Sequence, residues 1–361
     1  MSAPTAASRA PRALAEVYRR FAAAEAAGPA PLYERVGVGL SESDEALRAI
    51  ELAPARKRHP AVILAALHDL ALDGRAPALA AAYAAADGAA AADAAIGTLL
   101  QMTDEVVAVA VRRPVRSNET GRCAVLYPAI AEAARRAGAS AVGLIDAGGS
   151  AGLNLSVDRV GIAYSNGQLL GDPAAPVQMT ARITRGRVPA WAIPAVAARI
   201  LVDREPADVT DPAEVRWLRA CLPPDQPERR TRLDAELALA AGAPPVLLRG
   251  DVVSALPDAL ARVPADVLPV VLTTWALSAL RPESRLRFLH CLDAAATDRT
   301  VAWVSVEGVG VAPAIPTFGD RRASGHSIIG VAVFGHSTLR AGAAGRCWSR
   351  GGVLAWLAGS Q

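Results

Sequence analysis

The residues best suited to chemistry lie in one short stretch, residues 142–155, which reads VGLIDAGGSAGLNL. An apolar run ends at the acid Asp146, and small residues rich in glycine follow as far as Gly152. Glycines let the backbone adopt positive φ and approach a bound group closely. A helix that begins after the turn would add free N–H groups and partial positive charge. This order predicts a ligand site in which Asp146 accepts hydrogen bonds from an amine or a ribose hydroxyl.

The spacing within this turn separates several known loop patterns. The dinucleotide pattern G-x-G-x-x-G fails because Ser150 stands at the second glycine, and the phosphate loop fails because Lys57 is the only lysine. The hydrolase pattern G-x-S-x-G matches at Gly148, Ser150 and Gly152. The S-adenosylmethionine loop D-x-G-x-G-x-G matches at Asp146, Gly148 and Gly152, with Ser150 replacing the middle glycine. A tight strand–helix turn without a ligand is the remaining interpretation.

Serine hydrolysis would require an acid and a base in addition to Ser150. In hydrolases of this type the three residues follow the chain order Ser, Asp, His. Asp251 or Asp266 could be the acid, and His326 or His336 could be the base. Residues 1–137 look helical where a hydrolase sheet needs strands, and no His-Gly-Gly segment precedes the turn. Asp146 would also have no task in that mechanism. The hydrolase is therefore kept as an alternative.

Composition restricts the class of protein. The chain has 361 residues and a net charge of +3, with no basic block that would indicate nucleic-acid binding. Its four cysteines form no C-x-x-C pair, and its five histidines lack metal-ligand spacing, so neither a metal site nor a disulfide framework is expected. No signal-peptide core or uncharged apolar run of ~18 residues is present. We expect a cytoplasmic protein that binds neither nucleic acid nor a membrane.

The chain divides into regions of different pattern. Residues 1–10 look disordered, and residues 11–115 carry apolar residues at helical spacing, which predicts an all-α N-terminal cap domain. Residues 116–361 alternate between strand and helix patterns, which is typical of a mostly parallel sheet. Residues 159–197, rich in glycine and proline, are interpreted as an insertion within this α/β domain.

Several elements of the α/β domain can be placed. A helix is expected at Cys123–Ala137, ended by Gly138. After the glycine turn, further strands are expected at 198–209, with Asp203 near its end, and at 246–248, 267–273 and 300–306, the last ending at Glu307. The segments 328–334 and 353–357 are expected to pair as a hairpin with a long turn.

Three segments together carry a family resemblance: SNETGRC at 117–123, DAGGSAGLNLSVDR at 146–159 and DVTDPAEVRWL at 208–218. They resemble an uncharacterised bacterial family in which a helical N-terminal region precedes a core like that of S-adenosylmethionine-dependent methyltransferases. The resemblance implies a Rossmann-like methyltransferase sheet, mostly parallel with an antiparallel C-terminal hairpin. It also implies S-adenosylmethionine as cofactor. A small molecule is the expected methyl acceptor, because the chain lacks the Asn/Asp-Pro-Pro-Tyr pattern of amino-methylating nucleic-acid enzymes.

The resemblance also implies roles for individual residues. Asp146 would lie near the methionine amine, and Asp203, or Glu205 in its place, would bind the ribose. Asp251, at the tip of the third strand, would contact adenine. The expected cofactor-binding residues are Asp146, Gly148, Gly149, Ser150, Gly152, Asn154, Asp203, Asp251 and Thr274.

The acceptor and the methyl group would meet near the tip of the fourth strand, where Trp275 is the candidate catalytic residue. The polar segment before the Cys123 helix offers a second candidate, Glu119, together with Asn118 and Arg122 as substrate-binding residues. A helix cap with a surface ion pair is the competing interpretation of that segment. A regulator that binds S-adenosylmethionine without catalysis is a further alternative, since a fold does not settle a function.

Overall fold

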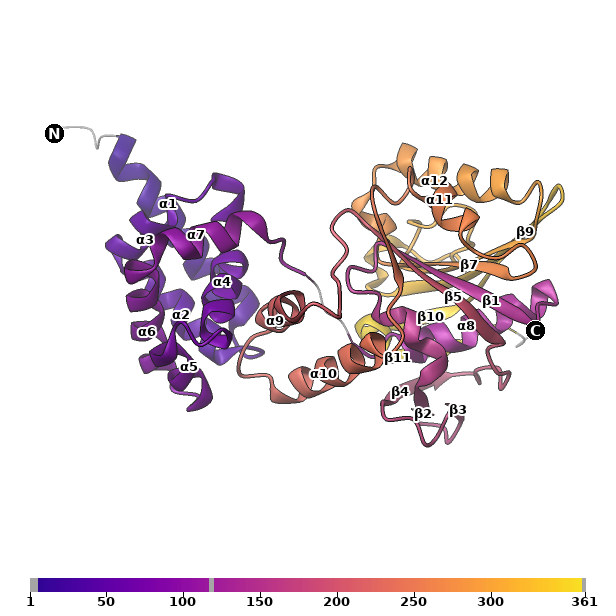
Figure 1. Cartoon of the computed structure of the whole chain (residues 1–361), viewed down its shortest axis with the longest axis horizontal. Coiled ribbons are helices and arrows are strands. Elements are labelled where there is room, and N and C mark those ends of the chain that lie inside the picture. Colours follow the sequence, from indigo (N-terminus) through magenta and orange to yellow (C-terminus); the bar gives the residue numbers. More distant parts are fainter. Residues whose placement is uncertain (1–5, 117–119, 359–361) are drawn as a thin grey trace. The chain divides into compact units, whose positions relative to one another are not determined.

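The structure is a computed structural model that describes residues 6–116 and 120–358, with side chains from residue 13 onward. The chain forms two compact units. The first comprises residues 1–118 and 211–233, and the second comprises residues 119–210 and 234–361. Figure 1 shows helices throughout the first unit and a large sheet in the second.

The first unit is helical, as the periodicity predicts. Four of its helices begin with proline, which has the backbone angle of a first helical turn and lacks an N–H that would have no partner there. Its helices are α1 (Ala6–Phe21), α2 (Pro31–Glu42), α3 (Asp44–Ile50), α4 (Pro60–Leu72), α5 (Pro77–Ala84), α6 (Gly88–Gln101), α7 (Thr103–Arg112) and α9 (Pro212–Ala220), with the π-helix Ala22–Ala26 and the short 3-10 helix Ala55–Lys57. Residues 6–10, expected to be disordered, lie in α1, and residues 1–5 lie outside the described part.

The helical unit also contains residues 211–233, which the sequence analysis assigned to the α/β domain. The reason is Trp217 on α9, which is fully buried in the helical core. Its indole Nε1 donates to the carbonyl oxygen of Pro114 at 2.8 Å. Arg216 beside it pairs with the buried Asp69 of α4 at 3.0 Å. The apolar spacing within a helix of nine residues predicts the helix but does not indicate which domain it packs against.

The second unit is built on an eleven-stranded, mostly parallel sheet with the order β3-β2-β4-β11-β10-β9-β8-β7-β1-β5-β6. Five neighbouring strands of this sheet, β6, β5, β1, β7 and β8 in spatial order, are all parallel. When these five are numbered by their order along the chain, their spatial order is 3-2-1-4-5. The strands are β1 (Ala141–Ala147), β2 (Gly161–Tyr164), β3 (Leu169–Gly171), β4 (Gln178–Arg185), β5 (Ala195–Asp203), β6 (Val246–Arg249), β7 (Leu268–Thr274), β8 (Val301–Gly308), β9 (Ser327–Gly335), β10 (Thr338–Trp348) and β11 (Val353–Trp356).

Helices cover both faces of this sheet (Figure 1). Strands β1, β7 and β8 are buried over almost their whole length, which explains why they read as continuous apolar runs. One face packs against α8 (Cys123–Ala137) and the end of α10 (Pro227–Ala241). The other face packs against α11 (Leu256–Ala261) and α12 (Pro282–Ala295).

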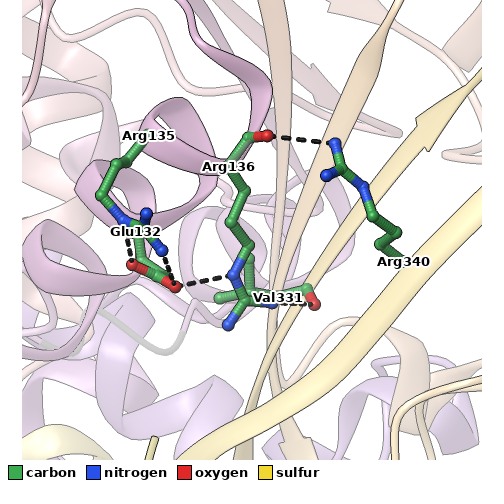
Figure 2. Close-up of polar contacts among 5 residues, drawn as sticks. All are labelled: Glu132, Arg135, Arg136, Val331 and Arg340. Carbon is green, nitrogen blue, oxygen red and sulfur yellow. Dashed lines mark hydrogen bonds and ion pairs between the residues drawn. The ribbon is translucent and has the colours of Figure 1, made fainter. Parts of the chain in front are cut away.

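Helix α8 is fixed to the sheet at its C-terminal end by a cluster of charged side chains (Figure 2). Both Arg135 and Arg136 bind the buried carboxylate of Glu132, Arg136 at 2.7 Å. Arg136 also donates to the carbonyl of Val331 on β9, and Arg340 on β10 donates to the carbonyl of Arg136 at 3.0 Å. Cations at this end also suit the helix dipole. The cluster therefore fixes α8, whose N-terminal end directly follows Arg122.

Two local expectations are wrong. The C-terminal hairpin consists of β9 and β10, with β11 paired antiparallel to β10 and parallel to β4. The segment of β10 is rich in alanine and glycine, so strand propensity missed it; Gly345 is needed there because a Cβ would lie 2.1 Å from the carbonyl oxygen of Ala355. After the glycine turn, the expected α-helix is a 3-10 segment, Leu153–Arg159, so a full helix dipole is absent at the turn.

Within the segment 159–197, expected to be an insertion, β2, β3 and β4 extend the sheet beyond β11, while its last three residues already belong to β5. Among the described helices none is by itself long and apolar enough to cross a membrane, whereas α6 and α7, bent by 91° at their junction, pass the same length and composition test as a pair.

Candidate functional site

Polar residues gather where the parallel strands of the second unit end. Since β1, β5, β6, β7 and β8 all run the same way, their carboxyl ends share one edge of the sheet. Chain order reverses between β1 and β7, and in open α/β sheets ligands bind outside the carboxyl ends of strands at such a switch point. The polar side chains at or just beyond these ends are Asp146, Asp203, Asp251, Thr274 and Glu307.

Asp146, at the end of β1, is completely buried. Its Oδ2 accepts a hydrogen bond from Asn154 Nδ2 at 3.0 Å, while no donor among the described residues lies within hydrogen-bonding distance of Oδ1. Burial raises the pKa of Asp146 to about 7, against the opposing influence of the Arg122 guanidinium and the Asn154 hydrogen bond. Asp203 adds a smaller upward shift. The fold therefore holds an incompletely satisfied carboxyl group under the glycine turn.

The glycine turn covers this carboxyl group closely. A Cβ on Gly149 would lie 1.9 Å from Asp146 Oδ2, so only glycine fits above the acid. Gly148 has φ +84°, and its Cβ would lie 2.8 Å from the Cβ of Ala276. Ser150 has φ +58°, an uncommon conformation for a residue with a side chain. Gly152 also has a left-handed backbone, with φ +66°.

A chain of polar contacts links the ends of α8, β1 and β7. Arg122, at the start of α8, donates through Nη1 to Thr274 Oγ1 at 3.1 Å. Asn154 Nδ2 bridges Thr274 Oγ1 at 3.2 Å and Asp146 Oδ2. The Arg122 guanidinium also lies over the indole of Trp275, 4.9 Å from the ring centroid. Four other predicted site residues, from the segments around residues 122, 154 and 274, are thus brought together with Asp146.

The expected ribose and adenine residues lie farther along the same edge. Asp203 ends β5, and its Oδ1 accepts from the N–H of Glu205 at 2.9 Å, which makes Asp203 the strand-end acid of the two. Asp251 lies two residues beyond β6 and forms an exposed ion pair with Arg204 at 2.7 Å. The Arg204 guanidinium lowers the pKa of Asp251, and the N–H of Val253 binds its Oδ1.

Three residues of this edge had no predicted role. Glu307 at the end of β8 is fully buried and accepts from the N–H of Leu277 at 3.0 Å. Ser327 at the start of β9 accepts from the indole Nε1 of Trp275 at 2.8 Å. Glu236 on α10 is buried and accepts from the N–H of Gly121, next to Arg122, at 2.9 Å. In the sequence, only Glu307 carried a signal that could have identified it, namely an acid at the end of an apolar strand. Ser327 and Glu236 carried no such signal.

Of the remaining candidates, those that the structure describes do not join this group. Asn118 and Glu119 lie outside the described residues. His326 pairs with Asp320 at 2.8 Å. Asp266 precedes β7 and His336 follows β9, which runs antiparallel to β8, so both lie at the opposite edge from Ser150. Within the described residues, no three His, Cys, Asp or Glu side chains converge as a potential metal site.

Comparison with known proteins identifies a family. Residues 15–356 match the family described as "Uncharacterized protein conserved in bacteria (DUF2332)". No curated protein and no solved structure matches the chain. Because the match covers the helical unit and the sheet through β11, the chain belongs to the DUF2332 family.

Proposed function

We propose that the chain binds S-adenosylmethionine at the carboxyl edge of β1 and β7 and transfers its methyl group to a small molecule. The observation that carries the proposal is the buried Asp146 beneath a glycine turn, with one carboxylate oxygen lacking a donor among the described residues. A buried, incompletely paired carboxylate is costly, and a nearby bound cation would offset that cost. S-adenosylmethionine carries two cationic centres, an ammonium and a sulfonium.

The strand order supports the same proposal. The order 3-2-1-4-5 of the parallel strands is that of a Rossmann-like, doubly wound sheet, and the glycine turn follows its first strand. Asp203 ends the second strand, where a ribose-binding acid is expected. Gly148, with φ +84° and Ala276 packed against it, has no space for a side chain, so only glycine allows the backbone to form this close turn at the strand end.

The residues of this chain would have distinct tasks. Bound S-adenosylmethionine would supply an electrophilic methyl group whose leaving group is already activated. Asp146 and Asp203 would hold the cofactor's cationic and ribose parts, while Thr274, Asn154 and Arg122 would keep the turn and the fourth strand in register. Trp275 would shield the reacting centre from water and orient the acceptor. Alignment and exclusion of water can supply much of the rate without a dedicated acid–base pair.

The hydrolase alternative has less support. The positive φ of Ser150 resembles a strained nucleophile turn. However, His326 is engaged by Asp320, Asp251 by Arg204, and the other acid and base lie at the far edge of the sheet. A nucleophile needs a base within hydrogen-bonding reach.

The test is a transfer assay with methyl-labelled S-adenosylmethionine and a fractionated bacterial metabolite extract, with the Gly148→Val variant as the inactive control. We expect label to appear in a small molecule with wild type only. Labelling of Ser150 by a fluorophosphonate probe, without methyl transfer, would instead establish the hydrolase. Binding of the cofactor without transfer in any fraction would favour the regulator.

A further inference from the structure

The turn that follows β7 is held by a buried carboxylate. Glu307 is fully buried at the end of β8, and its Oε1 accepts from the N–H of Leu277 at 3.0 Å. Burial raises the pKa of Glu307 to about 7, and the backbone N–H groups of Leu277, Ala276 and Ser278 act in the opposite direction. This hydrogen bond ties the end of β8 to the turn after β7 across 30 positions of sequence.

This turn contains the strained residue Trp275. Its φ is +58°, which is exceptional for a bulky side chain and is energetically unfavourable. The conformation persists because contacts on several sides hold it. The N–H of Trp275 donates to the carbonyl of Val306 at 2.9 Å, its indole donates to Ser327, and its carbonyl accepts from Ser278 Oγ at 2.8 Å.

The same turn contacts both halves of the candidate site. Ala276 lies so close to the glycine turn that a Cβ on Gly148 would be 2.8 Å from its Cβ. The indole of Trp275 lies under the Arg122 guanidinium. A displacement of residues 275–278 would therefore move the glycine turn and the tip of the fourth strand together.

The hydrogen bonding of the buried Glu307 carboxyl group is incomplete. Glu307 Oε2 has no hydrogen-bond donor among the described residues, so the carboxylate is desolvated at a cost that its N–H contacts offset only in part. Such cost is commonly kept where a site must be held in one strained geometry.

We propose that Glu307 is a positioning residue: by accepting the hydrogen bond from the N–H of Leu277 it holds Trp275 and the glycine turn in the geometry that the ligand requires. It acts through these residues and does not itself contact cofactor or acceptor. The part that concerns ligand binding rests on the proposed function, whereas the part that concerns the geometry of the turn does not.

The test compares the full chain with Glu307→Gln, which keeps the shape but removes the charge, and with Glu307→Asp, which keeps the charge but shortens the side chain. Glu283→Gln, an exposed glutamate on α12, is the matched control. Hydrogen exchange followed by mass spectrometry is measured on peptides that cover 147–152 and 275–279. Affinity for S-adenosylhomocysteine is measured by calorimetry at a temperature where every variant is folded.

We expect Glu307→Gln to speed exchange at both segments by about tenfold, with β8 and α12 unchanged, and to weaken S-adenosylhomocysteine binding by about fivefold, which corresponds to loss of one modest interaction. Unchanged exchange at both segments, an equal increase across the whole sheet, or unchanged affinity despite faster exchange would overturn the proposal. If Glu307→Gln does not fold, Glu307→Asp is judged by the same criteria. If wild type does not bind, the proposed function fails, and the exchange result alone decides whether Glu307 positions the turn.

Discussion

Asp146 illustrates how a single side chain can be found from sequence while its surroundings cannot. An acid at the end of an apolar run, followed by glycines, is visible in the sequence because strand ends and tight turns have strong composition. Its complete burial and its contact with Asn154 are properties of the folded turn. Gly149 proved necessary for a reason the pattern does not express, namely the volume of the Asp146 side chain itself.

The raised pKa of Asp146 makes stability depend on pH. Burial raises this pKa from 3.8 to about 7, so the folded chain binds the proton more tightly than the unfolded chain. The stabilising contribution of the protonated group is complete below its unfolded pKa and is lost as pH rises towards 7, at about 1.4 kcal/mol per pH unit. We therefore expect Asp146→Asn to gain stability relative to wild type between pH 5 and pH 7, measured by urea unfolding.

Subtracting the unfolding free energy of the variant from that of wild type removes the contributions of other titrating groups. Glu307 is one of these groups, because burial also raises its pKa to about 7. A difference in unfolding free energy that is constant with pH would show that Asp146 is ionised throughout and that its pKa is not raised.

Gly148 allows steric contact to be separated from backbone strain. Gly148→Ala adds a methyl group 2.8 Å from Ala276, whereas Gly167→Ala adds one with no neighbour within 4 Å, and the two glycines have nearly equal φ of +84° and +82°. Both should lose about 1–2 kcal/mol of unfolding free energy from strain. Only Gly148→Ala should also weaken S-adenosylhomocysteine binding, by about tenfold, as measured by calorimetry. Equal affinities in the two variants would place the ligand elsewhere.

Elements with strong local signals were predicted well. Helix α8 has the expected bounds, Cys123–Ala137, and ends at Gly138 with φ +67°. Strand β10 was missed because its small residues are selected by contact with β11, which no local pattern records. The same limit applies to the candidate site: Glu236 and Ser327 contribute through contacts between segments far apart in sequence, and no spacing rule connects them.

The two arginines of the charged cluster at the end of α8 should contribute unequally to stability. Arg136 is largely buried and contacts both Glu132 and β9, whereas the Arg135 side chain is 51% exposed. We expect Arg136→Met to lower the unfolding free energy by about 1–3 kcal/mol, and Arg135→Met by no more than about 1 kcal/mol. Urea unfolding of the two variants makes the comparison. Equal losses of unfolding free energy would mean that the cluster stabilises the protein through its salt bridges to Glu132 and not through the attachment of α8 to the sheet.

At the level of the molecule, the chain leaves the helical unit, builds part of the sheet, and returns to the helical unit at residues 211–233. A contiguous domain boundary near residue 115 therefore describes the chain incompletely. Helical and alternating patterns distinguish two regions in the sequence, but the return segment is too short for its pattern to reveal which unit it joins.

This topology predicts the behaviour of fragments. Residues 119–361 expressed alone would expose Trp217 and its neighbours on α9, which are buried in the helical core. We expect that fragment to be insoluble and to regain solubility when residues 1–118 are co-expressed, because burial of one large apolar side chain contributes about 1.5–3 kcal/mol. Soluble fraction and size-exclusion profile provide the measurement. A soluble, monomeric 119–361 fragment would show that α9 does not depend on the helical unit.

The decisive measurement for the proposed function is a calorimetric titration of the full chain with S-adenosylmethionine and S-adenosylhomocysteine, repeated with Asp146→Ala. We expect saturable 1:1 binding to wild type and affinity reduced by about tenfold or more in the variant, because a group that pairs with a charged amine is worth roughly 1.5–3 kcal/mol. Absence of binding by wild type, or equal affinity in Asp146→Ala, would contradict it.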